Sequence, residues 1–328
     1  MSHINSEAAQ VSELQAIVDD AYATHLSLRT GELADYIPEL TKVDPERFGV
    51  CVATADGRVF EAGDCDQLFT IQSISKPFAF GIALEELGHD KVLKHVGVEP
   101  SGDAFNSIEL QTGSNRPFNP MVNSGAIAVT ALLHAIHGDR TFDHLLARFG
   151  AIAGRPLTID EAVYESERRT GHRNRAIAYL LLNFGIVHEW AEAALDVYFK
   201  QCSILVTCRD LAMMAATLAN MGRHPLTDEH GIAIPCVKDV LSIMFTCGMY
   251  DYSGQWAYRV GVPAKSGVGG GVIAVVNRQL GIGTYSPRLD AHGNSCRGTE
   301  VCVELASRLG LHVFDCLNVG SSFLDAIL

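Results

Sequence analysis

The chain of 328 residues has few of the features that would place it in a membrane or on a nucleic acid. Its polar start, MSHINSEAAQ, lacks the basic and apolar segments of a signal peptide, and no later run of about 18 apolar residues could span a bilayer. Basic residues are fewer than acidic ones: the chain has 25 Lys and Arg and 38 Asp and Glu, which gives a formal net charge of −13. We therefore expect a cytoplasmic protein whose partners include neither a nucleic acid nor a membrane.

Disulfide and metal-binding patterns are also missing. The nine cysteines include no CxxC pair, and an odd number without an export signal is typical of reduced thiols that fill space in a core. No HExxH motif is present, and His134 with His137 is only an i, i+3 pair. We expect no metal and no organic cofactor.

What is present is enough apolar sequence for a large core, because 48% of the residues are hydrophobic and only 19% are charged. Residues 6–30 have the spacing of an amphipathic helix. Two apolar runs flank Asp56-Gly57 and predict a hairpin over 48–64 with a tight primed turn. Helical runs dominate from Ser73 to about residue 220. Strand-like segments and a final helix follow, at 256–262, 271–277, 280–285 and 299–309.

This order of segments predicts an α/β (α+β) fold. The N-terminal hairpin and the C-terminal strands would share one antiparallel sheet, helices from both chain ends would cover it, and an all-helical block would be inserted beside it. We predict a discontinuous sheet subdomain, residues 1–72 and 222–328, and a helical subdomain, residues 73–221. The active site would lie between them, where sites tend to form.

A candidate nucleophile stands where the helical block begins, in Ser73-Ile74-Ser75-Lys76. On a helix, positions i and i+3 share a face, so Lys76 could reach the Ser73 hydroxyl. Burial would lower the lysine pKa and make it a base that takes the serine proton. Pro77 fits only the opening turn of a helix, which favours a helix start close to Ser73. SxxK alone arises by chance in a chain of this length, and the alternative is an ordinary surface helix.

A second motif, Lys265-Ser266-Gly267, is followed by Val268 and three glycines and leads into an apolar run. Penicillin-recognising enzymes combine SxxK on a helix with K[ST]G on a facing strand. The backbone N–H groups of Ser73 and Val268 would then form an oxyanion hole. A phosphate loop is rejected, because its glycines precede the lysine. Lys265 would either set a local positive field or have a structural role. Together, the SxxK and KSG motifs predict an enzyme that forms an acyl-enzyme intermediate.

Beyond these motifs, residues 34–294 resemble the serine-dependent glutaminases of the β-lactamase-like fold, of the bacterial type. Seven blocks carry the resemblance: ADYIPEL, FTIQSISKP, NPMVNSGAI, SERRTGHRN, YFKQCSI, CGMYDYSGQ and PAKSGVGGG. The resemblance implies hydrolysis of L-glutamine to L-glutamate and ammonia. Ser73 would form the acyl-enzyme, Lys76 would be the general base, and no cofactor would be needed. A homodimer or homotetramer is also implied.

The resemblance extends to the remaining site residues. A proton would reach the departing nitrogen through Tyr250 or Lys76, and Tyr36 would lie on a mobile loop over the pocket. A carboxylate could pair with the substrate ammonium by a charge-assisted hydrogen bond. The implied substrate contacts are Glu167, Asn123, Asn174, Tyr198 and Val268. Without the resemblance, Glu167 would be interpreted as a solvated carboxylate. Asn123 and Asn174 would be interpreted as turn or cap residues, and Tyr198 as a core aromatic.

The chain departs from the family pattern at Ser124, where alanine is more usual, and at Gly269, where alanine also occurs. In both cases one small residue stands in place of another. Two other functions stay open. A penicillin-recognising hydrolase or peptidase would share the fold, but such enzymes are usually exported, and Glu167 suits an amino-acid substrate better. A non-catalytic glutamine-binding protein would have no need of the Ser73–Lys76 pair.

Overall fold

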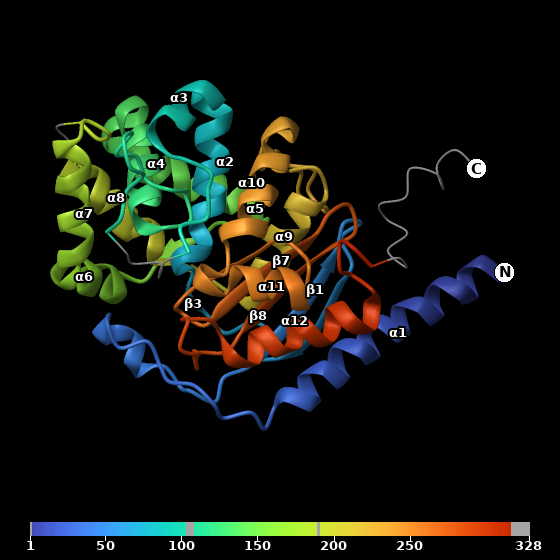
Figure 1. The fold of residues 1–328 in the computed structure, drawn as a ribbon. Helices are drawn as coiled ribbons and strands as arrows, with labels where there is room; N and C mark the ends of the chain where they lie inside the picture. The colour runs from blue at the N-terminus through green and yellow to red at the C-terminus, as the bar shows by residue number, and fades with distance from the viewer. Residues whose placement is uncertain (1, 103–107, 189–190, 316–328) are drawn as a thin grey trace.

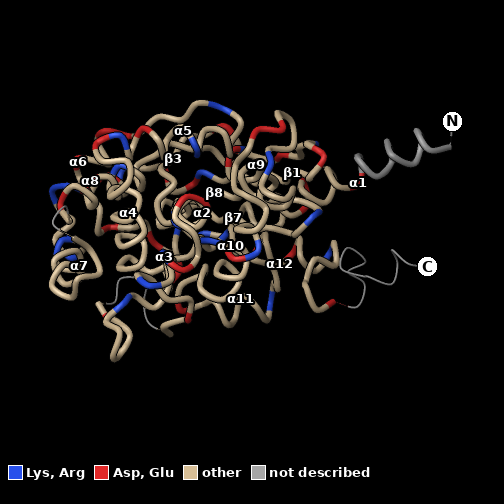
Figure 2. The backbone as a smooth tube through the Cα atoms, turned by 90° about the horizontal axis from the view of Figure 1, so that it is seen from above, with Lys and Arg blue, Asp and Glu red and all other residues tan. Residues whose placement is uncertain are grey.

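The computed structural model describes residues 2–102, 108–188 and 191–315. A central antiparallel sheet carries helices on both faces, and a block of helices stands beside it (Figure 1). Acidic and basic positions are interspersed along the described backbone (Figure 2). Among the described residues, no helix has both the length and the apolar character needed to cross a membrane.

The five strands of the main sheet lie in the order β2-β1-β8-β7-β6, and every neighbouring pair is antiparallel. Strand β1 pairs with β8 from Gly49–Tyr285 to Thr54–Leu280, so both ends of the chain share one sheet, as predicted. The strands are β1 (Gly49–Thr54), β2 (Val59–Gly63), β6 (Ala264–Ser266), β7 (Gly271–Val276) and β8 (Leu280–Tyr285).

The hairpin between β1 and β2 forms where it was predicted, but its turn is of another kind. The Gly57 N–H donates to the Thr54 carbonyl at 2.9 Å, and Gly57 has φ +91° whereas Asp56 does not have a positive φ. Both primed two-residue turns need a positive φ at the first central position, which here is Asp56. The chain instead uses a three-residue loop closed by a left-handed glycine, so the predicted primed turn is wrong.

The two faces of the sheet are covered by different helices because side chains alternate along each strand. Val50 and Val52 belong to the same apolar cluster as helices α1 (Ser2–His25) and α12 (Cys296–Leu309), which run side by side (Figure 1). Cys51 and Ala53 face the other way, toward α9 (Cys208–Ala219). The terminal helices therefore cover one face of the sheet, as predicted.

One predicted strand is a helix. Residues 256–262 were expected to be extended, yet α11 (Ser253–Arg259) occupies most of this segment, after α10 (Ile234–Cys247). Tyr252, Trp256 and Val260 are all buried and recur every four residues, which is the spacing of one helix face. The strand that follows, β6, begins only at Ala264.

The helical block fills the chain between β3 and α9. A small second sheet of order β3-β5-β4 joins its ends. Its strands are β3 (Phe69–Thr70), β4 (Thr158–Ile159) and β5 (Ile204–Val206). Its helices are α2 (Ser75–Leu87), α3 (His89–His95), α4 (Asn123–His137), α5 (Thr141–Ala153), α6 (Glu161–Thr170), α7 (His172–Asn183) and α8 (Ala191–Cys202). The division into two subdomains at the stated boundaries stays a prediction.

Candidate active site

Ser73 lies in a short 3-10 turn, Gln72–Ile74, that leads from β3 directly into α2. Only 7% of Ser73 is exposed. Gln72 has φ +50°, a strained backbone conformation that non-glycine residues rarely adopt and that recurs at functional sites. Pro77 falls in the opening turn of α2, which places the start of the helix next to Ser73 as predicted.

Lys76 is buried, with 1% of its surface exposed. Its Nζ donates to the Met121 carbonyl at 3.1 Å and to Asn123 Oδ1 at 2.7 Å. Burial lowers the pKa of Lys76 to about 8, although Cys202 and Glu167 oppose the shift. A neutral amine is therefore accessible near neutral pH. The two hydrogen bonds of Lys76 do not involve Ser73, whose side chain hydrogen-bonds with Tyr250.

The partners of Lys76 are held in place by Asn119, a residue that was not singled out from the sequence. The Asn119 Oδ1 accepts from the backbone N–H groups of Met121 and Val122, at 3.0 and 3.2 Å, and its Nδ2 donates to the Glu99 carbonyl. Asn119 is itself 1% exposed. The turn that it closes delivers the Met121 carbonyl and the first residue of α4, Asn123, to Lys76.

The turn after Lys265-Ser266 lies against the segment that carries Ser73. A Cβ on Gly267 would stand 2.9 Å from the Ile71 carbonyl oxygen, and a Cβ on Gly269 would stand 2.6 Å from that of Thr70. A side chain at either position would therefore crowd this backbone. The backbone N–H groups of Ser73 and Val268 donate no hydrogen bond to any described residue. Two unpaired donors therefore lie on the two segments that meet here.

Tyr250 links the two motifs. It has φ +57°, its hydroxyl donates to the Ser266 carbonyl at 3.0 Å, and it shares a hydrogen bond with Ser73. Burial raises the pKa of Tyr250, so its hydroxyl stays protonated at neutral pH. The Nζ atom of Lys265 lies 4.1 Å from the centroid of the Tyr250 ring.

Lys265 is fully buried and donates to the carbonyls of Gly248 and Ser266, at 3.0 and 2.7 Å. Burial and the charge of Lys76 lower its pKa well below the ordinary lysine value. A positive field, one of the two roles expected for Lys265, requires the charged form. The hydrogen bonds favour the structural alternative, in which Lys265 ties the strand β6 to the loop before Tyr250.

Glu167 projects from α6, which Asp160 caps by accepting from the Val163 N–H at 3.0 Å. Glu167 is 5% exposed, and its Oε1 accepts from Gln72 Nε2 at 3.0 Å. Burial raises the pKa of Glu167 to about 8, against the opposing effects of Gln72 and Lys76. Gln72 was not among the site residues predicted from the sequence. Its position next to Ser73 was the one feature of the sequence that could have indicated a role in the site.

The other proposed substrate contacts meet at Asn123. Its Nδ2 donates to Asn174 Oδ1 at 3.0 Å, and its Oδ1 accepts from the Tyr198 hydroxyl at 3.4 Å. Asn123 and Asn174 are partly exposed and Tyr198 is buried. Cys202 adjoins Lys76, Glu167 and Tyr198, and burial raises the pKa of its thiol, so it remains an uncharged neighbour.

Tyr36 lies at the mouth of the site. The residue is half exposed, whereas its hydroxyl is desolvated beside Glu167 and Tyr250, which raises its pKa. Tyr36 and Val268 line a hollow of about 340 Å³, and Tyr250 lines a neighbouring one of about 230 Å³. All nine residues selected from the sequence thus lie in one connected region; their roles stay predictions.

Comparisons with known proteins agree with this geometry. The glutaminase family model matches residues 31–314. A glutaminase of Trichormus variabilis is 53% identical over 308 residues, which cover 94% of this chain and 92% of that protein. A glutaminase of Nostoc sp. is 52% identical over 310 residues, which cover 94% of this chain and 93% of that protein.

Solved structures agree as well. A crystal structure of Mglu in its glutamate form has a TM-score of 0.88 and 42% identity, and the match covers 92% of this chain and 70% of that chain. A probable glutaminase, ybaS, has a TM-score of 0.88 and 41% identity, and the match covers 92% of this chain and 98% of that chain. Fold and site thus define an enzyme of the β-lactamase-like class. More narrowly, the chain belongs to the glutaminase family, whose members hydrolyse glutamine.

Proposed function

We propose that this protein hydrolyses L-glutamine to L-glutamate and ammonia through an acyl-enzyme on Ser73, with Lys76 as general base. The observation that carries the mechanism is the buried Lys76, whose pKa is lowered to about 8, one helical turn from a serine flanked by two unpaired N–H groups. A general base works best when its pKa lies near the operating pH. Tyr250, with its raised pKa, is an acid rather than a base.

In the first half-reaction, Ser73 Oγ attacks the side-chain amide carbon of glutamine while its proton passes to Lys76. The distance between the two side chains closes when substrate is bound, since catalytic hydrogen bonds often tighten only in the reacting complex. The oxyanion that forms accepts from the N–H groups of Ser73 and Val268. The carbon–nitrogen bond then breaks, and a proton from Lys76, relayed by Tyr250, leaves with ammonia.

In the second half-reaction, water attacks the glutamyl ester and gives its proton to Lys76. The ester bond breaks, Ser73 recovers the proton, and glutamate leaves. No metal or organic cofactor takes part in these steps.

Glutamine is oriented by its α-ammonium and α-carboxylate groups. Glu167 pairs with the ammonium, which requires the carboxyl group to lose the proton that burial favours in the empty pocket. Asn123, Asn174 and Tyr198, which share one hydrogen-bond network, hold the carboxylate. Tyr36 covers the bound substrate.

The test is to incubate the wild-type protein with L-glutamine and with L-asparagine over a range of phosphate concentrations. Glutamate, aspartate and ammonia are followed in parallel. Glutamate release by the wild type that is lost in Ser73→Ala is the expected result. Ser124→Ala is the matched control, because the buried Ser124 hydroxyl has no partner among the described residues. No glutamine turnover at any phosphate concentration would contradict the proposal.

The same material separates the two alternatives. Stable labelling of Ser73 by a penicillin, without glutamine turnover, would indicate a penicillin-recognising enzyme. Tight glutamine binding without ammonia release would indicate a binding protein. A cytoplasmic location and a homodimer or homotetramer stay predictions, which fractionation and light scattering would test.

A further inference from the structure

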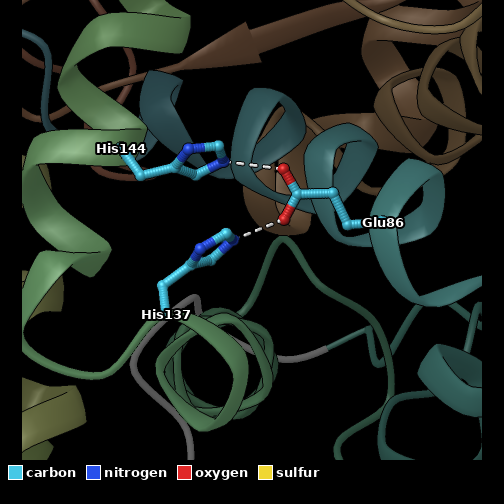
Figure 3. Close-up of side chains that lie close together, drawn as sticks. All are labelled: Glu86, His137 and His144. Atoms are coloured by element: carbon cyan, nitrogen blue, oxygen red, sulfur yellow. Dashed lines mark hydrogen bonds and ion pairs between the residues drawn. The ribbon is translucent and has the colours of Figure 1, made fainter.

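A second cluster of polar side chains lies at the far end of the helical block. Glu86 of α2, His137 at the end of α4 and His144 of α5 converge there (Figure 3). Their ligand atoms all lie within 4.8 Å of one another. We propose that Glu86, His137 and His144 form a binding site for a zinc-class transition-metal ion. The proposal departs from the expectation that the chain binds no metal.

The side chains already point at a common centre. His137 Nε2 lies 2.8 Å from Glu86 Oε2, and His144 Nε2 lies 2.6 Å from Glu86 Oε1 (Figure 3). The two imidazole rings stack with centroids 4.0 Å apart, which holds both Nε2 atoms on the same side. Two imidazoles and one carboxylate form a common protein ligand set for Zn²⁺, with water as the fourth ligand.

The adjustment needed to admit a metal is small. Zn²⁺ binds imidazole nitrogen and carboxylate oxygen at about 2.0–2.2 Å, so tetrahedral ligand atoms stand about 3.3 Å apart. The carboxylate would therefore recede by roughly half an ångström from its present hydrogen-bonding position. Glu86, His137 and His144 expose between 17% and 29% of their side chains, which leaves an entry path for the ion.

A nearby arginine orients the carboxylate. Arg148 NH1 donates to Glu86 Oε1 at 3.3 Å, and the guanidinium is itself held by Glu85 at 3.1 and 3.2 Å and by the Gly231 carbonyl at 2.8 Å. Glu85 compensates the arginine charge, and Glu86 Oε2, which pairs with His137 and not with Arg148, can turn toward the metal. Metal-ligating carboxylates are characteristically fixed by such outer hydrogen bonds.

The proposed site is distinct from the reaction pocket. Lys76 and Glu86 are ten positions apart on α2, which at 1.5 Å per residue is about 15 Å. A metal bound there would clamp the distal ends of the two helices, α2 and α4, whose first turns carry Lys76 and Asn123. The clamp stabilises the helical block and takes no part in the hydrolysis.

The experiment titrates Zn²⁺ into chelator-treated protein that carries no histidine tag, with calorimetry and thermal unfolding as readouts. We expect one equivalent to bind and the Tm to rise by about 4–8 °C at a hundredfold excess over Kd. His144→Gln and Glu86→Gln should weaken zinc binding at least about tenfold. His89→Gln, which removes an imidazole paired with Asp239 elsewhere on the surface, is the matched control and should bind zinc like the wild type.

Co²⁺ supplies a spectroscopic readout that thiols would change. Nitrogen and oxygen ligands should give visible ligand-field bands without a thiolate charge-transfer band. A thiolate band, equal zinc affinity in the wild type and the ligand variants, or no binding by the wild type would each overturn the proposal. Retained glutamine hydrolysis by His144→Gln would show that the variant is folded.

Discussion

The two ends of helices α2 and α4 carry different polar groups in different surroundings. At their first turns, Lys76 is 1% exposed and its pKa is lowered to about 8. At their last turns, the side chains of Glu86 and His137 are 17% and 24% exposed and pair with each other. Burial therefore distinguishes the end that holds the proposed general base from the end whose side chains stay partly exposed and pair with each other.

The largest effect should come from Lys76→Met, which keeps the length of the side chain but removes the base. We expect kcat to fall by about 10²–10⁴-fold. Lys91→Met, at an exposed position of α3, should leave kcat unchanged. Activity in Lys76→Met close to that of the wild type, with an unchanged circular dichroism spectrum, would assign the base to another group.

The pH profile is the next most informative quantity. Lys76 must be neutral to act as a base, and Glu167 must be ionised to bind the ammonium, so both must lose a proton, each with a pKa of about 8. We therefore expect kcat/KM to rise with pH and to level off above about pH 8, with a logarithmic slope greater than one below pH 7. A profile that is flat from pH 6 to 9 would contradict these shifts.

Glu167→Gln removes the charge with little change in volume. Hydrogen bonds to charged groups contribute about 1.5–3 kcal/mol, so KM for glutamine should rise about 10–150-fold, with a smaller change in kcat. The pH slope should also fall toward one. Glu165→Gln is the control, since this exposed carboxylate lies on the same helix and pairs with Arg168. An unchanged KM in Glu167→Gln would remove Glu167 from the ammonium site.

The smallest effect is expected at the distal end of the helices. In the presence of a chelator, Glu86→Gln should change kcat/KM by less than about twofold. Partly exposed ion pairs contribute only about 0.2–1 kcal/mol, so the Tm should fall by a few degrees at most. A large loss of activity, measured beside an unfolding curve that matches the wild type, would mean that the two ends are coupled.

Sequence patterns predicted the sheet well where the strands are wholly buried. The apolar runs at 271–277 and 280–285 became β7 and β8 because both faces of the sheet are covered by helices. A strand was wrongly predicted at residues 256–262 because Trp256 and Val260 favour strands, whereas the burial of these residues follows a helical period. Tertiary packing, and not intrinsic strand propensity, determined that this segment is a helix.

The pocket was predictable only as far as its motifs were recognisable. Asn119 and Gln72 escaped notice because their importance rests on the direction of a side chain and on a positive φ, neither of which a sequence displays. The pair that was considered for a metal, His134 and His137, does not converge, since His134 Nδ1 contacts the Thr141 hydroxyl. His137 instead meets His144, because the packing of three helices decides which histidines meet.

A partition experiment tests the serine acyl-enzyme most directly. L-glutamine and the γ-methyl ester of L-glutamate are hydrolysed separately in the presence of hydroxylamine, and the ratio of glutamyl hydroxamate to glutamate is measured for each. An intermediate on Ser73 common to both donors predicts the same ratio from both, and no product above background from Ser73→Ala. Ratios that differ between the donors, or hydrolysis without any hydroxamate, would contradict a shared acyl-enzyme.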